Sequence, residues 1–568
     1  MILLAGLECV LASETYICNK LKQFIAIEIQ KMKFVKHIIA CLLSVLLFYI
    51  SWPPHSVPGF IFIAFVPVLY LLFNFKSDLG KFSSSYLFGL LFCTFFILNF
   101  LLSSWLIYAH WFGGIFASIV NGFLMSVVCL LIYKIKINLG AKQAYFAFPI
   151  IWLAFEYLHL NWDLTWPWMS LGNVFAEQPN WVQWYEYTGV LGGSFWVLLV
   201  NTHLYFSLKK LFKKEAFIKP LLFSVLFICT PFIVSNKTIS NTNYFSGEEV
   251  KVVLVQPNYE PHNEKFSTPL NTQLQEVESL LESVWINTPD LIVLPETFIT
   301  DWIWESRRET SPAVLRMKSW LNKYPTTQII TGASTGKVLT DKEAQKPTAR
   351  ESRNGTIYEV FNSALLISKE QETQVFHKSK LVPGAEMTPF SSLLKPIFDK
   401  FPIKLGGTIG NFGINDSLQN FNSYKGKFTP VICYESVFGE YVSSFNSLGS
   451  NWICIITNDG WWGDTFGHQQ HNSYARLRAI ESRKYVVRSA NTGISSVINP
   501  IGMVEQFLPY GESGIIEATI TKSDKNTFYA QHGDYLGRLA SFLAIIYLLQ
   551  LILRYLKTEK TDLKSITK

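Results

Sequence analysis

The chain has 568 residues, enough for more than one structural unit, and its composition averages two different environments. Hydrophobic residues make up 49% of the chain and charged residues only 16%, whereas soluble domains carry about 25% charged residues. The shortfall lies in the first half, because residues 247–525 have the composition of an ordinary soluble domain. The net charge of +7 does not indicate nucleic-acid binding, since Lys and Arg cluster beside apolar stretches, where membrane topology explains them.

Eight apolar stretches are long enough to cross a bilayer as helices, which takes about 20 residues, or somewhat fewer where a helix is interrupted. Seven precede the soluble segment and one follows it: residues 37–52, 57–75, 84–108, 113–134, 143–160, 188–208, 218–235 and 536–556. Buried core helices are the alternative for any single stretch. Seven of them within 235 residues, with few charges, predict a transmembrane bundle over residues 37–235 and an eighth span after the soluble segment.

Basic residues lie in alternate loops between these stretches. They precede the first stretch, follow the second, fourth and eighth, and separate the sixth from the seventh, while loops 51–59 and 108–114 have none. By the positive-inside rule, both termini are expected in the cytoplasm and residues 247–525 in the periplasm. Residues 1–36 would be a cytoplasmic extension and residues 557–568 a cytoplasmic tail. Because Met32 with Lys33 and Lys36 is typical of a basic start before a signal anchor, residues 1–31 are expected to matter little.

In the soluble segment, short β-branched runs alternate with longer mixed ones. The short runs predict strands over residues 250–256, 290–294, 328–332, 363–367, 373–376, 429–433 and 452–457. The mixed runs predict helices over residues 274–285, 313–323 and 469–484. Strands that alternate with helices indicate a layered α/β domain.

Three residues capable of acid–base or nucleophilic chemistry stand where predicted strands end, the place where active sites of α/β sheets commonly lie. Glu296 follows the strand that ends in LIVLPE, Lys378 follows strand 373–376, and Cys433 ends the strand TPVIC. Burying a charge at an apolar strand end is costly unless the charge has a partner. We therefore expect the carboxylate and the ammonium to be paired.

A thiol, a carboxylate and an ammonium form a chemically sensible set. A free thiol needs activation, and a nearby carboxylate can take its proton. An ammonium, together with the backbone N–H that follows the Cys, can stabilise a tetrahedral oxyanion. Each residue alone has a structural alternative: a small buried side chain or a disulfide with Cys454 for the thiol, a helix cap or ion pair for the Glu, and a surface charge for the Lys.

The context of these residues resembles a known family. PETF, FHKSKLVPGAE and ICYES, in this order, resemble the three catalytic motifs of the nitrilase superfamily. The extended motifs, with TNDGWWGDTFGHQQHNSYARLRAIESRKYVVRSANTGISS after the Cys, are similar to the apolipoprotein N-acyltransferase family, as is WPWMSLGNVFAEQPNWVQWYEYTGVLGGSFWV at residues 166–197. The resemblance implies a polytopic α-helical membrane bundle of about eight spans. Between the seventh and eighth spans it places an α/β nitrilase-like αββα sandwich.

Carried over residue by residue, the resemblance makes Glu296 the general base, Lys378 the stabiliser of thiolate and oxyanion, and Cys433 the nucleophile. Lys380 competes for the lysine role, but the pattern aromatic-x-Lys-x-x-Leu-Val-Pro places that role on Lys378. Glu386 matches a second carboxylate of the family. It is expected to orient Lys378 and polarise an incoming amine, or else to be a surface charge.

Four more residues are expected to line the site: Tyr434, Glu435, Trp461 and Trp462. The structural alternative for Glu435 is an ion pair with Arg488, and for the two Trp residues it is core packing. Beside a membrane, interfacial Trp side chains can also guide acyl chains or enter lipid. The chain has Gly384 and Ala385 where the family often has Phe-Gly, so the neighbouring loop is expected to differ in shape.

The resemblance implies transfer of a fatty acyl chain from a phospholipid, through a Cys433 thioester, to the N-terminal diacylglyceryl-cysteine amine of an apolipoprotein at the bacterial inner membrane. The tails of both substrates stay in the bilayer. The sequence has no phosphate loop and no zinc-spaced ligand cluster, so no cofactor and no metal are expected. His468 and His471 in HQQH are compatible with a metal pair, but surface or packing roles explain them better.

Two other functions fit parts of the pattern. A membrane-anchored amidohydrolase of nitrilase type would share the three residues and use water as the acceptor. A transporter or receptor with an inert α/β lid would need polar residues in its spans. Only isolated ones occur there, namely Asn99, Asn121 and Glu156, which argues against transport.

Overall fold

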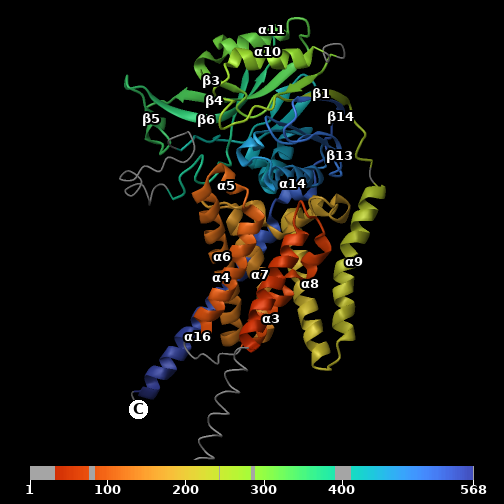
Figure 1. Cartoon of the computed structure of the whole chain (residues 1–568), viewed down its shortest axis with the longest axis vertical. Helices are drawn as coiled ribbons and strands as arrows, with labels where there is room; N and C mark the ends of the chain where they lie inside the picture. The colour runs from red at the N-terminus through yellow and green to blue at the C-terminus, as the bar shows by residue number, and fades with distance from the viewer. Residues whose placement is uncertain (1–31, 76–82, 242, 283–287, 391–410, 567–568) are drawn as a thin grey trace, which may run out of the picture.

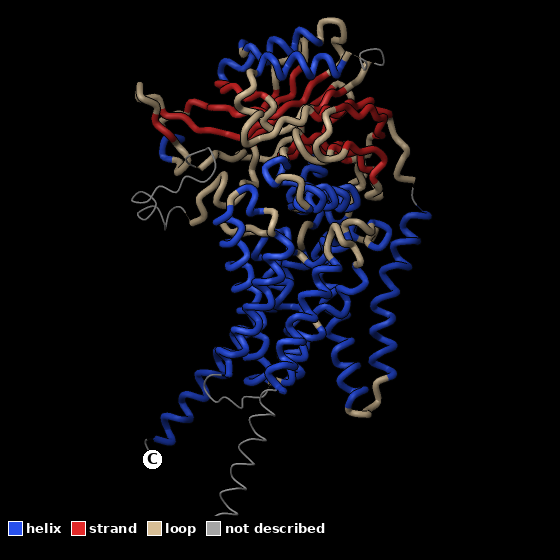
Figure 2. The backbone as a smooth tube through the Cα atoms, in the orientation of Figure 1, coloured by secondary structure: helices blue, strands red, loops and turns tan. Residues whose placement is uncertain are grey.

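The computed structural model describes residues 32–75, 83–241, 243–282, 288–390 and 411–566. They form a helical bundle that carries an α/β domain at one end, with the last helix returning through the bundle (Figures 1 and 2). The predicted extension over residues 1–31 lies outside the described residues. The predicted fold class, a polytopic helical bundle with a nitrilase-like sandwich, is confirmed.

The bundle consists of the helix Met32–Ser51 and the following elements: α2 (Ile61–Ala64), α3 (Val66–Asn74), α4 (Ser83–Ser103), α5 (Leu106–Ala109), α6 (Trp111–Leu139), α7 (Ala141–Leu160), α8 (Tyr185–Phe212), α9 (Ile218–Asn241) and α16 (Tyr535–Ile566). Six described helices are long and apolar enough to cross a membrane. The remaining two predicted stretches are the shorter apolar helix Pro58–Asn74 and helix α7, which carries Lys142 and Glu156. The described residues thus hold about the number of spans that the sequence predicts.

The α/β domain contains two sheets stacked face to face. The first is eight-stranded, in the order β14-β1-β2-β4-β6-β5, with β3 on β4 and β7 on β6. Its strands are β1 (Glu249–Gln256), β2 (Leu291–Val293), β3 (Ile299–Trp304), β4 (Gln328–Val338), β5 (Arg350–Glu351), β6 (Ile357–Ile367), β7 (Gln374–His377) and β14 (Gly514–Thr521). The second is six-stranded, in the order β13-β12-β11-β10-β9-β8. Its strands are β8 (Phe421–Ser423), β9 (Gly426–Ile432), β10 (Trp452–Thr457), β11 (Val486–Ala490), β12 (Ser495–Ile498) and β13 (Val504–Leu508).

Helices cover the outer face of each sheet and complete four layers. Helices α10 (Leu270–Leu281) and α11 (Pro312–Trp320) pack on the first sheet through one apolar cluster, at the far end from the bundle (Figure 1). Helices α13 (Gly439–Ser444) and α14 (Phe466–Ser482) pack on the second sheet through another. The core between the sheets joins residues of both, among them Leu254, Ile330, Ile432 and Ile456. Strands covered on both faces read as continuous apolar runs, which is why the sequence predicted them.

All seven predicted strands and all three predicted helices are present, with ends that differ from the predicted ones, while residues 283–285 of the first predicted helix lie outside the described residues. The end of strand 429–433 is wrong in a way that matters. Strand β9 stops at Ile432, and Cys433 begins a 3-10 helix, Cys433–Val437. Cys433 has a φ of 51°, in the left-handed region, so the chain turns sharply there instead of continuing the strand.

Helix α14 attaches the α/β domain to the bundle. The Gln470 amide donates to the Pro53 carbonyl at 2.8 Å and accepts from the Trp168 indole at 2.6 Å. One turn further, the Tyr474 hydroxyl donates to the Trp168 carbonyl at 3.1 Å and accepts from the indole of Trp52 at 3.0 Å. Tyr474 also belongs to the same apolar cluster as the bundle helices. These buried polar contacts fix how the domain sits on the bundle.

We predict that Gln470→Ala destabilises the protein by about 2 kcal/mol, because it leaves a buried indole N–H and a backbone carbonyl without their partner. The measurement is the apparent Tm in detergent. Gln469→Ala, one residue away on the same helix at a half-buried position, serves as the matched control and should change Tm little. Equal losses in the two variants would contradict the assigned docking role.

Candidate active site

Glu296 lies in a tight turn after β2. The next residue, Thr297, has a φ of 49°, and the turn packs directly against Gly332 of β4. A Cβ at Gly332 would come within 2.3 Å of the Thr297 nitrogen and 2.6 Å of the Glu296 Cα, so only glycine leaves room for this turn. The Lys265 ammonium also holds this turn, because it donates to the Glu296 carbonyl at 2.9 Å and to the Thr297 hydroxyl at 3.0 Å.

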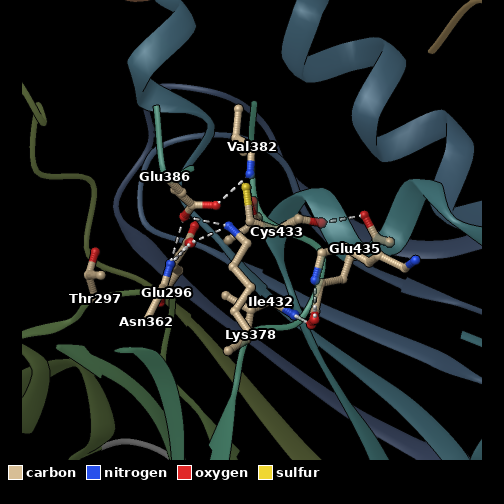
Figure 3. A network of polar contacts seen from close by, with 12 residues as sticks. Glu296, Thr297, Asn362, Lys378, Val382, Glu386, Ile432, Cys433 and Glu435 are labelled. Carbon is tan, nitrogen blue, oxygen red and sulfur yellow. Dashed lines mark hydrogen bonds and ion pairs between the residues drawn. The ribbon is translucent and has the colours of Figure 1, made fainter. Parts of the chain in front are cut away.

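Lys378 follows β7 and points between two carboxylates (Figure 3). Its Nζ lies 2.8 Å from Glu386 Oε1 and 3.4 Å from Glu296 Oε1, and its side chain is 1% exposed. Burial by itself lowers the pKa of this lysine. The carboxylates of Glu386 and Glu296 outweigh that effect, so its pKa stands well above the ordinary value. The side chain is therefore a fixed cation in the site.

The Asn362 side chain of β6 joins the two carboxylates. Its amide donates to Glu296 Oε1 at 2.8 Å and to Glu386 Oε1 at 3.1 Å. The second Glu386 oxygen accepts the Val382 N–H at 2.9 Å, which ties the loop after Lys378 to the cluster. Each carboxylate is thus oriented by at least two donors, and the predicted orientation of Lys378 by Glu386 has a direct contact.

Cys433 stands in the positive-φ turn after β9, and its sulfur points toward this cluster (Figure 3). Glu435 shapes the turn, because its carboxylate accepts the Ile432 N–H at 2.8 Å and the Ser379 N–H at 2.6 Å. Burial raises the pKa of the Cys433 thiol, the Glu296 charge raises it further, and the Lys378 ammonium only partly opposes them. The resting thiol is therefore protonated.

Three alternatives from the sequence fail against the geometry. Glu435 does not pair with Arg488, which instead contacts Asp459 at 2.6 Å. The Glu435 carboxylate accepts the Ile432 and Ser379 N–H groups instead. Lys380 turns away from the carboxylate cluster. Its Nζ lies 5.2 Å from the centre of the Phe438 ring. Cys433 and Cys454 are both free thiols, so no disulfide links them.

The predicted aromatic residues contact either the bundle or a loop of the α/β domain. The Tyr434 hydroxyl donates to the Thr165 carbonyl at 2.9 Å, across to the segment before the buried Trp168. The ring of Trp462 packs on Trp105 at 4.6 Å. Trp461 stacks instead on Phe266 at 6.3 Å. Trp462 thus belongs to the contact between the domain and the bundle, whereas Trp461 packs on a loop of the α/β domain itself.

Sequence reasoning missed Lys265 and Asn362 because nothing in their local pattern marks them. Burial lowers the pKa of Lys265 to about 7, against the raising effect of Glu296, so its ammonium is held at some cost beneath the turn. Both histidines of HQQH, His468 and His471, are buried, which agrees with the packing role and not with a surface one. Among the described residues, no group of three His, Cys, Asp or Glu side chains is arranged to hold a metal ion.

Comparison with known proteins identifies relatives of both parts of the chain. Residues 251–527 match the model of the carbon–nitrogen hydrolase family, and residues 44–203 match that of the apolipoprotein N-acyltransferase N-terminal domain. The chain is 29% identical over 507 residues to an apolipoprotein N-acyltransferase of Chlorobaculum tepidum, which covers 87% of this chain and 92% of that protein. It is 31% identical over 379 residues to the one of Aquifex aeolicus, covering 66% and 76%.

Among solved structures, the chain is similar to Nit3 of Saccharomyces cerevisiae, a member of branch 10 of the nitrilase superfamily. That match has a TM-score of 0.33 and 16% identity, and it covers 51% of this chain and 95% of Nit3.

The raised pKa of the thiol yields a prediction about its reactivity. The rate at which iodoacetamide alkylates Cys433 should keep increasing with pH beyond pH 9, because the thiolate fraction has not yet saturated. The rate is measured by mass spectrometry of the peptide that contains Cys433. A short unstructured peptide with one Cys is the control and should level off above the ordinary thiol pKa of about 8.5. A plateau for Cys433 below pH 8 would contradict the assigned charge balance.

Proposed function

The chain belongs to the apolipoprotein N-acyltransferase family, and from this premise we propose that Cys433 carries a fatty acyl chain from a phospholipid to the N-terminal diacylglyceryl-cysteine amine of a lipoprotein. One observation carries the proposal. The thiol, the Lys378 ammonium and the Glu296 carboxylate interact in one buried cluster, and the 3-10 helix that begins at Cys433 packs in part on the bundle.

The first half-reaction loads the enzyme. Glu296 takes the thiol proton, and the sulfur of Cys433 attacks the ester carbonyl carbon, forming a C–S bond while the carbonyl electron pair moves onto oxygen. The Lys378 ammonium and the N–H after Cys433 stabilise this oxyanion. When the carbonyl re-forms, the C–O bond to the lysophospholipid breaks, and the leaving oxygen takes the proton from Glu296. The product is a thioester.

The second half-reaction runs through the same groups. The neutral amine of the acceptor attacks the thioester carbon and passes a proton to Glu296, while Lys378 again faces the oxyanion. Collapse breaks the C–S bond, forms the amide, and returns the proton to the sulfur. Glu386 supports both halves by holding Lys378 at 2.8 Å. In this proposal it also polarises the incoming amine. No ATP is required, because the thioester keeps the acyl group activated for transfer to the amine.

The membrane setting explains why this chemistry is built on a bundle. Removing an acyl chain from lipid costs about 0.8 kcal/mol for each CH₂ group, so both substrates must react while their tails remain in the bilayer. The 3-10 helix of Cys433 belongs in part to the same apolar cluster as the bundle, through Tyr434 and Val437. The reacting ester therefore needs only to rise to the membrane surface.

The orientation is part of the proposal. We place the bundle in the bacterial inner membrane, the α/β domain in the periplasm, and both termini in the cytoplasm. The support is the charge pattern: Lys209 and Lys210 stand in the last turn of α8, and Lys213 and Lys214 lie in the loop between α8 and α9. That loop lies at the end of the bundle opposite to the domain (Figure 1).

The nucleophile is tested by the intact mass of the protein purified with its native lipid. Wild type should carry an added mass of one fatty acyl group that hydroxylamine releases, and Cys433→Ala should not. Adding an acceptor peptide with an N-terminal diacylglyceryl-cysteine should discharge the adduct to an amide. Release of free fatty acid, with no acylated peptide, would instead support the amidohydrolase alternative, and a bare mass in both proteins would contradict the thioester.

The orientation predicts opposite labelling of two engineered cysteines. Ser513→Cys lies at an exposed position of the α/β domain and should react with a membrane-impermeant maleimide in intact spheroplasts. Lys213→Cys, whose native side chain is 59% exposed in the α8–α9 loop, should react only after lysis. Wild type measures the background from native cysteines, and the reverse pattern would invert the topology.

A further inference from the structure

His471 of α14 lies directly behind the nucleophile. Its Nε2 is 3.2 Å from the carbonyl oxygen of Cys433 and 2.8 Å from the Ser436 hydroxyl. That hydroxyl donates to the same Cys433 carbonyl at 2.7 Å. The imidazole is fully buried, so these contacts do not exchange with solvent. Two side chains, those of His471 and Ser436, therefore contact the carbonyl oxygen of Cys433.

The other side of the imidazole is fixed just as firmly. Nδ1 lies 2.9 Å from Asp459 Oδ1, and the second Asp459 oxygen accepts from Arg488 at 2.6 Å. Burial raises the pKa of Asp459, but Arg488 and His471 lower it far below its ordinary value, so the carboxylate stays ionised. Arg488 Nη2 also lies 3.0 Å from Nδ1. A carbonyl oxygen only accepts, so the contact with Cys433 is satisfied when the ring donates from Nε2. Its donor edge then faces the Cys433 carbonyl.

The carbonyl of Cys433 and the N–H of Tyr434 belong to one peptide group. Hydrogen bonds accepted by the oxygen of an amide polarise it and strengthen its N–H as a donor. That N–H lies in the first turn of the 3-10 helix Cys433–Val437, where the helix itself leaves donors unused. It is also the N–H expected to face the oxyanion of the acyl-transfer reaction.

We propose that His471 is a positioning residue that, with Ser436, polarises the peptide group between Cys433 and Tyr434 and so strengthens the donor that stabilises the oxyanion. The inference rests on the proposed function, because it assumes that Cys433 attacks a carbonyl. It assigns a role to one half of the HQQH motif. The other half differs: His468 pairs with Asp464 at 3.2 Å and stacks on Tyr510, away from the Cys433 carbonyl.

The role separates two reactions of the same thiol. Acylation passes through an oxyanion and uses the polarised N–H, whereas alkylation by iodoacetamide is a displacement at carbon that forms no oxyanion. Weakening the donor should therefore slow acylation and leave alkylation unchanged. A merely structural role would slow both, because a displaced thiol loses both reactions.

The experiment measures single-turnover acylation of Cys433 by bacterial phospholipid extract in detergent micelles, followed by intact mass, beside alkylation by iodoacetamide across pH 6–9. His471→Leu removes the donor and should slow acylation about tenfold or more, since loss of a whole oxyanion donor costs about 10²–10³ in rate. His471→Gln keeps an amide N–H near Nε2 and should retain most of the rate. Ser436→Ala, a smaller change, should show a selective loss like that of His471→Leu.

His468→Gln is the matched control and should behave as wild type in both reactions. Acylation and alkylation falling in parallel in His471→Leu and Ser436→Ala, or neither rate changing, would overturn the proposal. Failure of the proposed function has a different signature, because wild type itself would then form no acyl adduct while still being alkylated.

Discussion

The buried ammonium of Lys378 is the constraint on which the rest of the site depends. A buried charge survives only with close partners, and here the partners are the carboxylates of Glu296 and Glu386 at 3.4 and 2.8 Å. Those carboxylates need donors of their own, which Asn362 and the Val382 N–H supply. Satisfying one lysine therefore fixes a turn after β2, a residue in β6 and the loop after β7. The charge holds three elements of the first sheet in one geometry before any substrate arrives.

The second sheet brings the nucleophile to this charged cluster, and helix α14 links that sheet to the membrane. On one side, His471 contacts the Cys433 carbonyl, and on the other, Gln470 and Tyr474 bond to Trp168 in the segment that connects bundle helices. Neighbouring residues of one helix thus face the reacting peptide and the bundle at once. A displacement of the bundle surface would therefore also move the turn that carries Cys433. The contacts of α14 fix the position of the nucleophile relative to the membrane.

The sequence alone predicted the bundle, the layered α/β domain and the three residues at strand ends, because long apolar stretches and buried strands leave strong local patterns. The family resemblance, and not the local pattern, implied that Glu386 orients Lys378, and the two side chains are in contact at 2.8 Å. Sequence reasoning missed Asn362 and Lys265, since their roles come from side chains that meet only after the sheet forms. It missed the left-handed turn at Cys433 for a related reason: Glu435 forms that turn by binding the Ile432 and Ser379 N–H groups, one of which comes from a distant segment. Contacts between residues that are distant in the sequence do not change the periodic pattern of apolar residues, so that pattern cannot predict them.

The charge balance of the resting site explains why the thiol of Cys433 is unreactive before substrate binds. Because Lys378 is already paired with two carboxylates, its ammonium stabilises a thiolate only in part, and burial together with Glu296 keeps the thiol protonated. Forming the thiolate requires Glu296 to accept the proton. That transfer removes one negative charge beside Lys378 and leaves the ammonium freer to face the thiolate and then the oxyanion. Activation is thus coupled to proton transfer within the cluster, and the nucleophile becomes strong only when an ester carbonyl is in place to take the electron pair.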